Sequence, residues 1–305
     1  MPRTEGRVLA IFGPTASGKT AVAEAVADRV GGEVVSADSM QAYRGLPLLT
    51  AQPERPTRLV GIWPLSHEGS VAEYARLAHQ EVDALLAAGA TPVLAGGTGL
   101  YLRAALVDLE LPPAPSRDLR AHWERVYDRL GPERAHALLT GRDPEAAAHL
   151  HANDRRRVVR ALELTGLGSS LRPQADRLWT DEVRHPTTIF GLEVPRDLLS
   201  ERIAQRARRM FEEGVVEEAR AALAGEISST AVRALGLREV AELPPDEALA
   251  ALVTRTRRYA AYQRKWMRRI PGLVSVNADR PPDEIADEIV QVASARQRLP
   301  AGRAG

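Results

Sequence analysis

Short apolar runs alternate with amphipathic segments along the first hundred residues. Four of these runs are continuous, as in strands buried on both faces, and they lie at 7–13, 32–38, 57–65 and 91–99. Residues 19–31 and 70–89 instead repeat apolar positions every three or four residues, which is typical of helices with one buried face. The alternation predicts an α/β fold with a parallel sheet covered by helices on both faces. In such a sheet, functional loops gather at the carboxyl ends of the strands.

The pattern changes after about residue 108. A proline-rich linker covers 109–116, and from Ser116 to Arg184 the periodicity is helical with no convincing strand. An apolar run at 187–194 returns to strand character, and helices follow it. We therefore predict an α/β core at 1–113 and 186–295 with basic C-terminal helices, an inserted all-helical, RNA-binding lobe at 114–185, and a frayed tail at 296–305.

The composition limits the possible partners. The 305 residues carry 41 basic and 40 acidic side chains, so a nucleic-acid partner would need a local basic surface. The absence of cysteine excludes disulfides and thiolate chemistry. No apolar run approaches a signal peptide or the ~18 residues of a membrane span. We expect a soluble, cytoplasmic protein that works as a monomer.

The segment "GPTASGKT" at 13–20 follows an apolar run and opens a predicted helix. It fits G-x-x-x-x-G-K-[ST], in which backbone N–H groups at a helix N-terminus cradle phosphates. Lys19, one of only two lysines, supplies a compact positive charge, and the Thr20 hydroxyl is a ligand for Mg²⁺. The motif predicts a bound diphosphate and a core of the P-loop NTPase type, and it leaves open whether the diphosphate belongs to ATP.

Polar residues end two further predicted strands. Asp38, within "SADSMQAYRG", is placed beside the phosphate loop as a general base or a Mg²⁺ ligand, although an aspartate here can also simply stabilise a turn. Gln41 offers a donor and an acceptor to a purine edge. In "GGTGLY" at 96–101, glycines permit close approach to a ligand and Thr98 offers a hydroxyl to a leaving-group oxygen. An ordinary glycine turn is the alternative there.

Two basic stretches stand out in this otherwise balanced chain. "NDRRRVVR" at 153–160 is, on its own, typical of a solvated helix face. The second stretch, at 254–269, places basic and aromatic residues on one helical face: Arg255, Arg258, Tyr262, Lys265 and Arg269. RNA bases stack on rings and guanidinium planes, so the two stretches together favour an RNA partner. The opposite face, with Leu252, Tyr259 and Trp266, is expected to pack in the core.

Taken together, the sequence resembles the tRNA dimethylallyltransferases, also called tRNA isopentenyltransferases. The matching segments come in the family's order and cover nearly the whole chain: "GPTASGKT", "SADSMQAYRG", "GGTGLY", "ANDRRRVVRALEL", "RALGLREV" and "TRRYAAYQRKWMRR". The resemblance implies that the loop at 13–20 holds dimethylallyl diphosphate rather than ATP. The acceptor would be N6 of the adenine immediately 3′ of the tRNA anticodon, and the products N6-isopentenyladenosine and diphosphate.

The resemblance also implies roles for individual residues. Asp38 matches the general base and Thr98 a residue at the breaking bond, with Lys19 stabilising the leaving diphosphate. Diphosphate contacts are implied for Gly13, Pro14, Thr15, Ala16, Ser17, Gly18, Lys19, Thr20 and Arg206. Contacts to tRNA are implied for Asp38, Ser39, Met40, Gln41, Thr98, Arg120, Arg156, Arg157, Val158, Val159 and Arg160.

The chain departs from the family pattern at two places. Gln52 stands where a lysine is expected, and "LVGIWPL" at Leu59–Leu65 replaces a His-His-Leu motif. These positions put the donor affinity in question. Two other functions stay open: a P-loop kinase that uses ATP on a small molecule, with the helical lobe as a lid, and an RNA-binding protein that has lost the chemistry.

Overall fold

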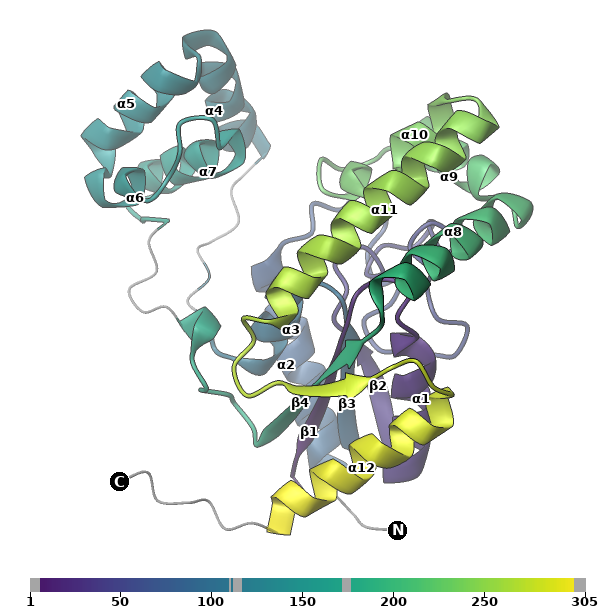
Figure 1. Cartoon of the computed structure of the whole chain (residues 1–305). Helices are drawn as coiled ribbons and strands as arrows, with labels where there is room; N and C mark the ends of the chain where they lie inside the picture. Colours follow the sequence, from purple (N-terminus) through teal and green to yellow (C-terminus); the bar gives the residue numbers. More distant parts are fainter. Residues whose placement is uncertain (1–5, 110, 112–116, 172–176, 299–305) are drawn as a thin grey trace. The chain divides into compact units, whose positions relative to one another are not determined.

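The computed structural model describes residues 6–109, 111, 117–171 and 177–298 (Figure 1). The chain divides into two compact units, an α/β unit of residues 1–108 with 178–305 and a helical unit of residues 109–177. The helical insertion predicted at 114–185 therefore ends earlier along the chain, since residues from 178 onward belong to the α/β unit. The linker predicted at 109–116 lies mostly outside the described residues.

A five-stranded parallel sheet forms the centre of the α/β unit, in the order β2-β3-β1-β4-β5. Its strands are β1 (Val8–Phe12), β2 (Gly32–Ser36), β3 (Thr91–Gly96), β4 (Thr187–Glu193) and β5 (Val274–Asn277). The register pairs Leu9 with Val93 on one side of β1 and with Thr188 on the other. The predicted parallel α/β fold is confirmed.

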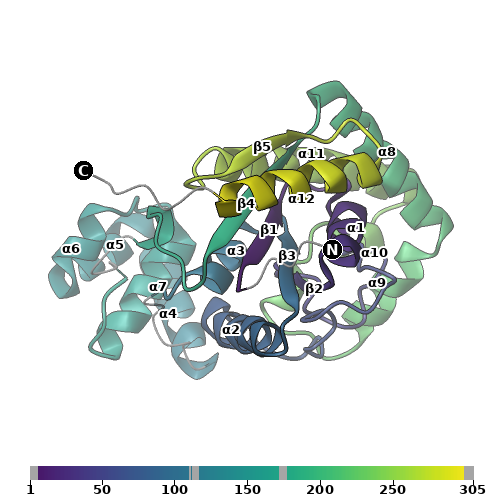
Figure 2. The same cartoon turned by 90° about the horizontal axis from the view of Figure 1, so that it is seen from below.

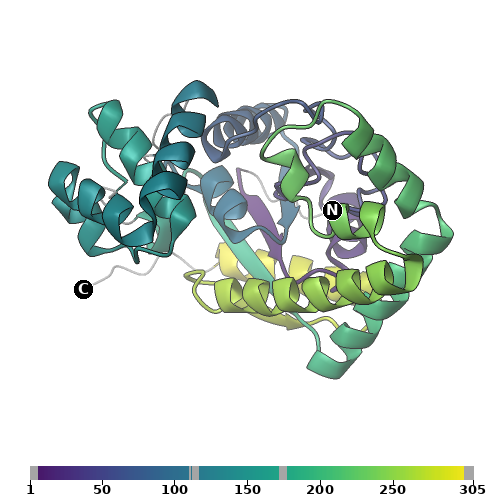
Figure 3. The same cartoon turned by 90° about the horizontal axis from the view of Figure 1, so that it is seen from above.

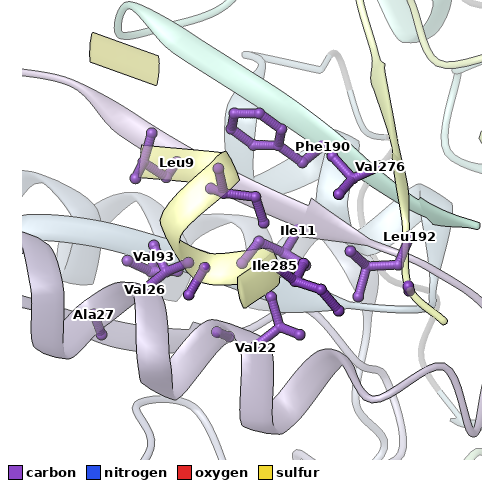
Figure 4. Close-up of a cluster of buried hydrophobic side chains, with 14 of the residues drawn as sticks. Leu9, Ile11, Val22, Val26, Ala27, Val93, Phe190, Leu192, Val276 and Ile285 are labelled. Carbon is purple, nitrogen blue, oxygen red and sulfur yellow. The ribbon is translucent and has the colours of Figure 1, made fainter. Parts of the chain in front are cut away.

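Helices cover both faces of this sheet (Figure 2). On one face lie α1 (Lys19–Val30) and α12 (Pro282–Arg298), and on the other lie α2 (Val71–Ala87) and α3 (Gly99–Leu106). The first face forms a large apolar core, where Ile11 and Phe190 of the sheet meet Val26 of α1 and Ile285 of α12 (Figure 4). Fully burying such side chains stabilises the fold by about 1.5–3 kcal/mol each.

A second group of helices packs beyond the sheet: α8 (Arg196–Glu212), α9 (Val215–Ala224), α10 (Leu237–Glu242) and α11 (Pro245–Met267), with the short turn η2 (Ala231–Arg233). Their buried faces enclose Leu46 and Leu49 from the long connection between β2 and α2. Figure 3 looks at the α/β unit from the side of these helices, with α11 in yellow-green and the β2–α2 connection in blue-violet. These helices therefore hold the connection that carries Asp38.

The prediction of a strand at 57–65 is wrong. Only two isolated bridges occur there, Val35 with Arg58 and Tyr43 with Trp63. Leu59 and Gly61 adopt positive φ angles of 64° and 62°, so the backbone turns twice within a run whose composition looks extended. The segment is a folded connection.

The helical unit contains α4 (Arg117–Leu130), α5 (Pro132–Arg142), α6 (Pro144–Ala148) and α7 (Arg155–Gly166), and the turn η1 (Arg177–Trp179) follows it. Its described residues form no strand, as predicted. The apolar core gathers Trp123, Leu139, Val158, Val159 and Leu162. Val158 and Val159, which the sequence assigned to a tRNA-contacting segment, are 0% and 4% exposed, so their side chains pack inward.

The frayed C-terminal tail was predicted to begin at residue 296, and the structure differs from this prediction. Helix α12 continues to Arg298, so residues 296–298 are helical rather than frayed, and 299–305 lie outside the described residues. Among the described residues, no helix has both the length and the apolar character needed to cross a membrane.

Candidate active site

Three loops meet at the carboxyl edge of the sheet because β2, β3 and β1 are neighbours and run parallel. The loop after β1 holds residues 13–18, the loop after β2 holds Asp38, and the turn after β3 holds Thr98. Ser39 N–H points to Thr98 Oγ1 at 3.4 Å, which ties the second loop to the third. The sequence-predicted catalytic residues are thus brought to one place.

The phosphate loop has the tight backbone that its glycines predict. Gly18 has φ 85° immediately before α1, and Ala16 has φ 62°, so the chain curls around the helix start. A Cβ at Gly13 would lie 2.8 Å from Ser17 Oγ, which explains why a side chain is not accommodated there. A tight glycine loop that runs into the N-terminus of a helix, as here at α1, is an arrangement that binds phosphates.

Lys19 lies inside this loop with its Nζ donating to the carbonyl of Pro14 at 2.8 Å. Burial lowers the pKa of Lys19 to about 8; Asp38 acts to raise this pKa, and Arg206 to lower it further. At neutral pH the Lys19 side chain is therefore mostly the charged ammonium, and a modest rise in pH would deprotonate it. A buried cation of this kind is strongly stabilised by an anion placed beside it.

Arg206 reaches the same loop from α8. Its Nη2 donates to Thr15 Oγ1 at 2.7 Å. Burial lowers the pKa of Arg206, and Asp38 opposes that shift. Within the part of the chain that the structure describes, Arg206 makes no ion pair with a carboxylate. Two cations and one carboxylate thus share the site, and this excess of positive charge suits an anionic ligand.

Asp38 follows β2 by two residues. Its Oδ1 accepts the N–H of Met40 at 3.0 Å, which fixes the carboxylate as the start of a turn. Among the described residues no donor is within hydrogen-bond distance of Oδ2. The turn-stabilising role and a base role are therefore compatible, since each uses a different oxygen.

Thr98 is the residue before α3, and its hydroxyl has two weak neighbours. Ser39 Oγ lies at 3.5 Å and the Tyr259 hydroxyl of α11 at 3.4 Å. Burial, and secondarily Asp38, raise the pKa of Tyr259, so its phenol is protonated. Tyr259, which the sequence pattern predicts on the packed face of its helix, thus also borders the site.

Gln41 and Gln52 turn their amides inward. Gln41 Oε1 accepts from Ser36 Oγ at 2.9 Å, and its Nε2 donates to the Ala51 carbonyl at 2.9 Å. The expected contact of the Gln41 amide with a purine edge would require these bonds to break. Gln52 Nε2 donates to the carbonyls of Tyr43 at 2.6 Å and Gln41 at 3.2 Å. The glutamine at a family lysine position thus stabilises the β2–α2 connection.

The other departure, Leu59–Leu65, contributes to the same connection. Trp63 packs edge-on against Tyr43 with ring centroids 5.5 Å apart, and Trp63 N–H donates to the Ala42 carbonyl. Neither departure therefore removes a group from the phosphate loop itself.

The predicted basic residues of the helical unit divide into two groups. Arg120 Nε and Arg160 Nη1 each bind Glu163, at 3.0 Å, and the Glu163 side chain is 0% exposed. These two arginines neutralise a buried carboxylate and so have a structural role. Arg156 and Arg157 are exposed at the start of α7, with Arg157 3.6 Å from Asp154.

The basic face of α11 has the exposure that its spacing predicts. The residues Arg255, Arg258, Tyr262, Lys265 and Arg269 are all exposed, and Tyr262 is 54% exposed. The Tyr262 ring stacks on Tyr259 with centroids 6.5 Å apart and meets Trp266 edge-on at 6.4 Å. Arg269 lies 3.8 Å above the ring of Trp179. This helix therefore presents cations and rings together.

Few side chains at the candidate site could bind a divalent cation. Thr20 follows Lys19 at the start of α1 with an exposed side chain. The described residues hold no group of three or more His, Asp or Glu side chains that would bind a metal by itself. Mg²⁺ keeps several waters and is commonly held by one or two protein ligands plus substrate phosphates, so a hydroxyl beside a diphosphate cradle fits it.

Comparison with known families decides the assignment. The IPP transferase family profile matches residues 41–270, and the Isopentenyl transferase profile matches residues 6–57. The chain belongs to the IPP transferase family. Relatives of this IPP transferase include the tRNA dimethylallyltransferase of Streptomyces coelicolor, 44% identical over 278 residues that cover 87% of this chain and 88% of the relative. The Streptomyces griseus protein of the same name is 41% identical and covers 88% of this chain and 89% of the relative.

Solved structures agree with this IPP transferase assignment. The tRNA isopentenylpyrophosphate transferase of Bacillus halodurans is 32% identical, with a TM-score of 0.68 over 96% of this chain and 99% of that one. A eukaryotic dimethylallyltransferase acting on tRNA has a TM-score of 0.77 over 98% of this chain and 81% of that one. At 21% identity the second likeness establishes the fold alone.

Proposed function

We propose that this protein transfers the dimethylallyl group of dimethylallyl diphosphate to N6 of the adenine immediately 3′ of the tRNA anticodon. The products are N6-isopentenyladenosine and diphosphate. One observation carries the proposal: Lys19 and Arg206 both donate hydrogen bonds to the phosphate loop, to the Pro14 carbonyl and to Thr15 Oγ1, and the carboxylate of Asp38 lies near enough to act on both cations. This arrangement binds a diphosphate and leaves a carboxylate to serve as base.

The reaction moves electrons from the purine to the diphosphate. As the allylic C–O bond breaks, negative charge grows on the diphosphate oxygens, and the new C–N bond forms at N6. Lys19, Arg206 and the N–H groups of the loop stabilise that charge more in the transition state than in the ground state. Thr98 offers its hydroxyl to the oxygen that leaves. Asp38 Oδ2 accepts the N6 proton, while Oδ1 stays bound to Met40 N–H.

Mg²⁺ is the proposed cofactor. When bound, it neutralises part of the diphosphate charge. Thr20 is the proposed protein ligand because its hydroxyl is exposed at the start of α1, next to Lys19. The diphosphate oxygens and water would complete the six ligands that Mg²⁺ requires.

The exposed side of α11 in the α/β unit and the exposed arginines of α7 in the helical unit are each proposed to contact tRNA. The target adenine must leave its stack, which requires a few kcal/mol and least in a single-stranded loop. Arg258, Tyr262 and Lys265 offer stacking and charge on the exposed side of α11. We also propose that the protein acts as a monomer in the cytoplasm, where tRNA is found.

A kinase function is less well supported by the site. A P-loop kinase commonly uses an acidic residue on the metal and a second acidic residue as base. In the part of the chain that the structure describes, Asp38 is the carboxylate that faces Lys19 and Arg206. A lost activity is also disfavoured, because the full set of Lys19, Asp38 and Thr98 is present and assembled.

The test is mass analysis of nucleosides. An anticodon stem-loop with adenine 3′ of the anticodon is incubated with the protein, Mg²⁺ and dimethylallyl diphosphate, and parallel reactions contain ATP or the Asp38→Asn variant. We expect one adenosine to gain a single C₅H₈ unit in the first reaction only. Failure to modify both the stem-loop and full-length tRNA, with turnover of ATP instead, would refute the proposal.

A further inference from the structure

Gln263 of α11 is a buried polar side chain between the phosphate loop and the turn after β3. It is 2% exposed and lies far along the chain from both segments that it contacts. A buried amide is expected to use its hydrogen-bonding groups fully, because a polar group left unpaired in the interior destabilises the fold. The partners of this amide therefore show what it holds in place.

Both ends of the amide bind backbone atoms of the active site. Gln263 Oε1 accepts the N–H of Thr15 at 2.8 Å, and Nε2 donates to the carbonyl of Gly97 at 2.9 Å. Thr15 belongs to the phosphate loop, and Gly97 precedes Thr98. Because the amide has distinct donor and acceptor ends, only one orientation satisfies both bonds.

The sequence around the amide leaves room for it. A Cβ at Gly97 would lie 2.2 Å from Gln263 Nε2 and 3.1 Å from the carbonyl oxygen of Gly13. The glycine in the "GGTG" turn is thus required by the close approach of Gln263 and of the phosphate loop. One turn earlier in α11, the Tyr259 hydroxyl lies 3.4 Å from Thr98 Oγ1. Successive turns of α11 therefore contact successive residues of the turn after β3.

We propose that Gln263 is a positioning residue for the transfer reaction. Its amide fixes the separation between the diphosphate cradle and the Thr98 hydroxyl, and so holds the leaving-group oxygen against both. The inference rests on the function proposed above and deepens it. Gln263 itself does not touch the reactants, since its two ends are occupied by Thr15 and Gly97.

The size of the effect follows from how geometry controls rate. A misplacement of about 1 Å in a reacting group can slow a reaction about 100-fold. Thr15 N–H is already bonded to Gln263, so on this proposal the diphosphate relies on other groups of the loop, with Lys19 and Arg206 beside it. Loss of the Gln263 bonds should therefore leave diphosphate affinity largely intact while the chemical step slows.

Two substitutions at Gln263 separate positioning from packing. Gln263→Glu keeps the shape and the acceptor for Thr15 but sets an oxygen against the Gly97 carbonyl, and Gln263→Met removes both bonds. Thr256→Val is the matched control, because Thr256 is buried on the same helix two turns earlier and, among the described residues, makes no side-chain hydrogen bond to either loop. Gly97→Ala disturbs the same bond from the other side.

The measurements are the single-turnover transfer rate, the affinity for inorganic diphosphate and the thermal unfolding midpoint. We expect the Gln263 variants and Gly97→Ala to transfer about 100-fold more slowly, with diphosphate affinity within about threefold of the wild type. Thr256→Val should keep the wild-type rate.

Three outcomes would overturn the inference: an unchanged rate, a loss of rate and diphosphate affinity in parallel with a lowered unfolding midpoint, or failure of both Gln263 variants to fold. A wild-type protein that transfers no dimethylallyl group would instead refute the proposed function, which keeps the two failures distinct.

Discussion

The state of Lys19 predicts how donor binding depends on pH. Burial lowers the pKa of this lysine to about 8, so the ammonium is charged below that pH and neutral above it. At pH 7 about nine-tenths of the side chain is charged, and at pH 9 about one-tenth. If the charged form alone binds diphosphate, the dissociation constant, once corrected for the ionisation of diphosphate itself, is nearly constant below pH 8 and rises about tenfold for each pH unit above it.

Two measurements check this prediction. Isothermal titration of inorganic diphosphate between pH 6.5 and 9.5, the range set by the pKa of about 8, gives the dissociation constant. Selective ¹³C-lysine labelling gives the pKa directly, because Lys19 and Lys265 are the only lysines in the sequence. The variant Lys265→Arg assigns the two signals. We expect the Lys19 signal to titrate near pH 8 in the free protein and at higher pH with diphosphate bound, since an anion favours the charged form.

The matched variant is Lys19→Ala, which should bind diphosphate weakly and with little change across the same pH range. An equal slope in wild type and variant would mean that another group titrates, and the reasoning would be refuted. A Lys19 signal that titrates at its ordinary value near 10.5 would show that burial does not act on it.

Three further substitutions test the remaining assignments. Asp38→Asn should lower kcat about 10²–10⁴-fold with unchanged tRNA affinity, because the base is lost; a parallel loss of affinity would make Asp38 a binding residue. Replacing both Arg156 and Arg157 by Ala should weaken tRNA binding and lower the salt slope by about 1–2, whereas an unchanged slope would make that face merely solvated. Glu163→Gln should destabilise the helical unit by about 3–5 kcal/mol in urea unfolding, since Arg120 loses its charged partner; an unaltered midpoint would contradict this.

Local sequence patterns were sufficient to predict those parts of the candidate site that directly follow a strand. The apolar run before Gly13 and the polar residues at Asp38 and Thr98 identify three strand ends, and parallel pairing brings strand ends together. The same logic failed at 57–65, where composition favours a strand but positive φ angles at Leu59 and Gly61 bend the chain. Backbone angles of non-glycine residues such as Leu59 have no signal in composition.

Long-range partners were beyond the reach of sequence patterns. Arg160 belongs to a run of arginines, yet it differs from exposed Arg156 because Glu163, one turn later, is buried. Gln263 stands in a basic stretch whose composition is typical of an exposed helix face, yet it is 2% exposed. Its partners at Thr15 and Gly97 lie 248 and 166 positions away, so only the folded chain reveals them.

Helix α11 has one side exposed to solvent and one side packed against the catalytic loops, and the two sides have different roles. Tyr262 and Lys265 face solvent, while Tyr259 and Gln263, their near neighbours in the same helix, are held against the catalytic loops. The side chains available to an acceptor and those that hold the catalytic loops therefore belong to neighbouring positions of one rigid element, which shortens the path between the two halves of the site.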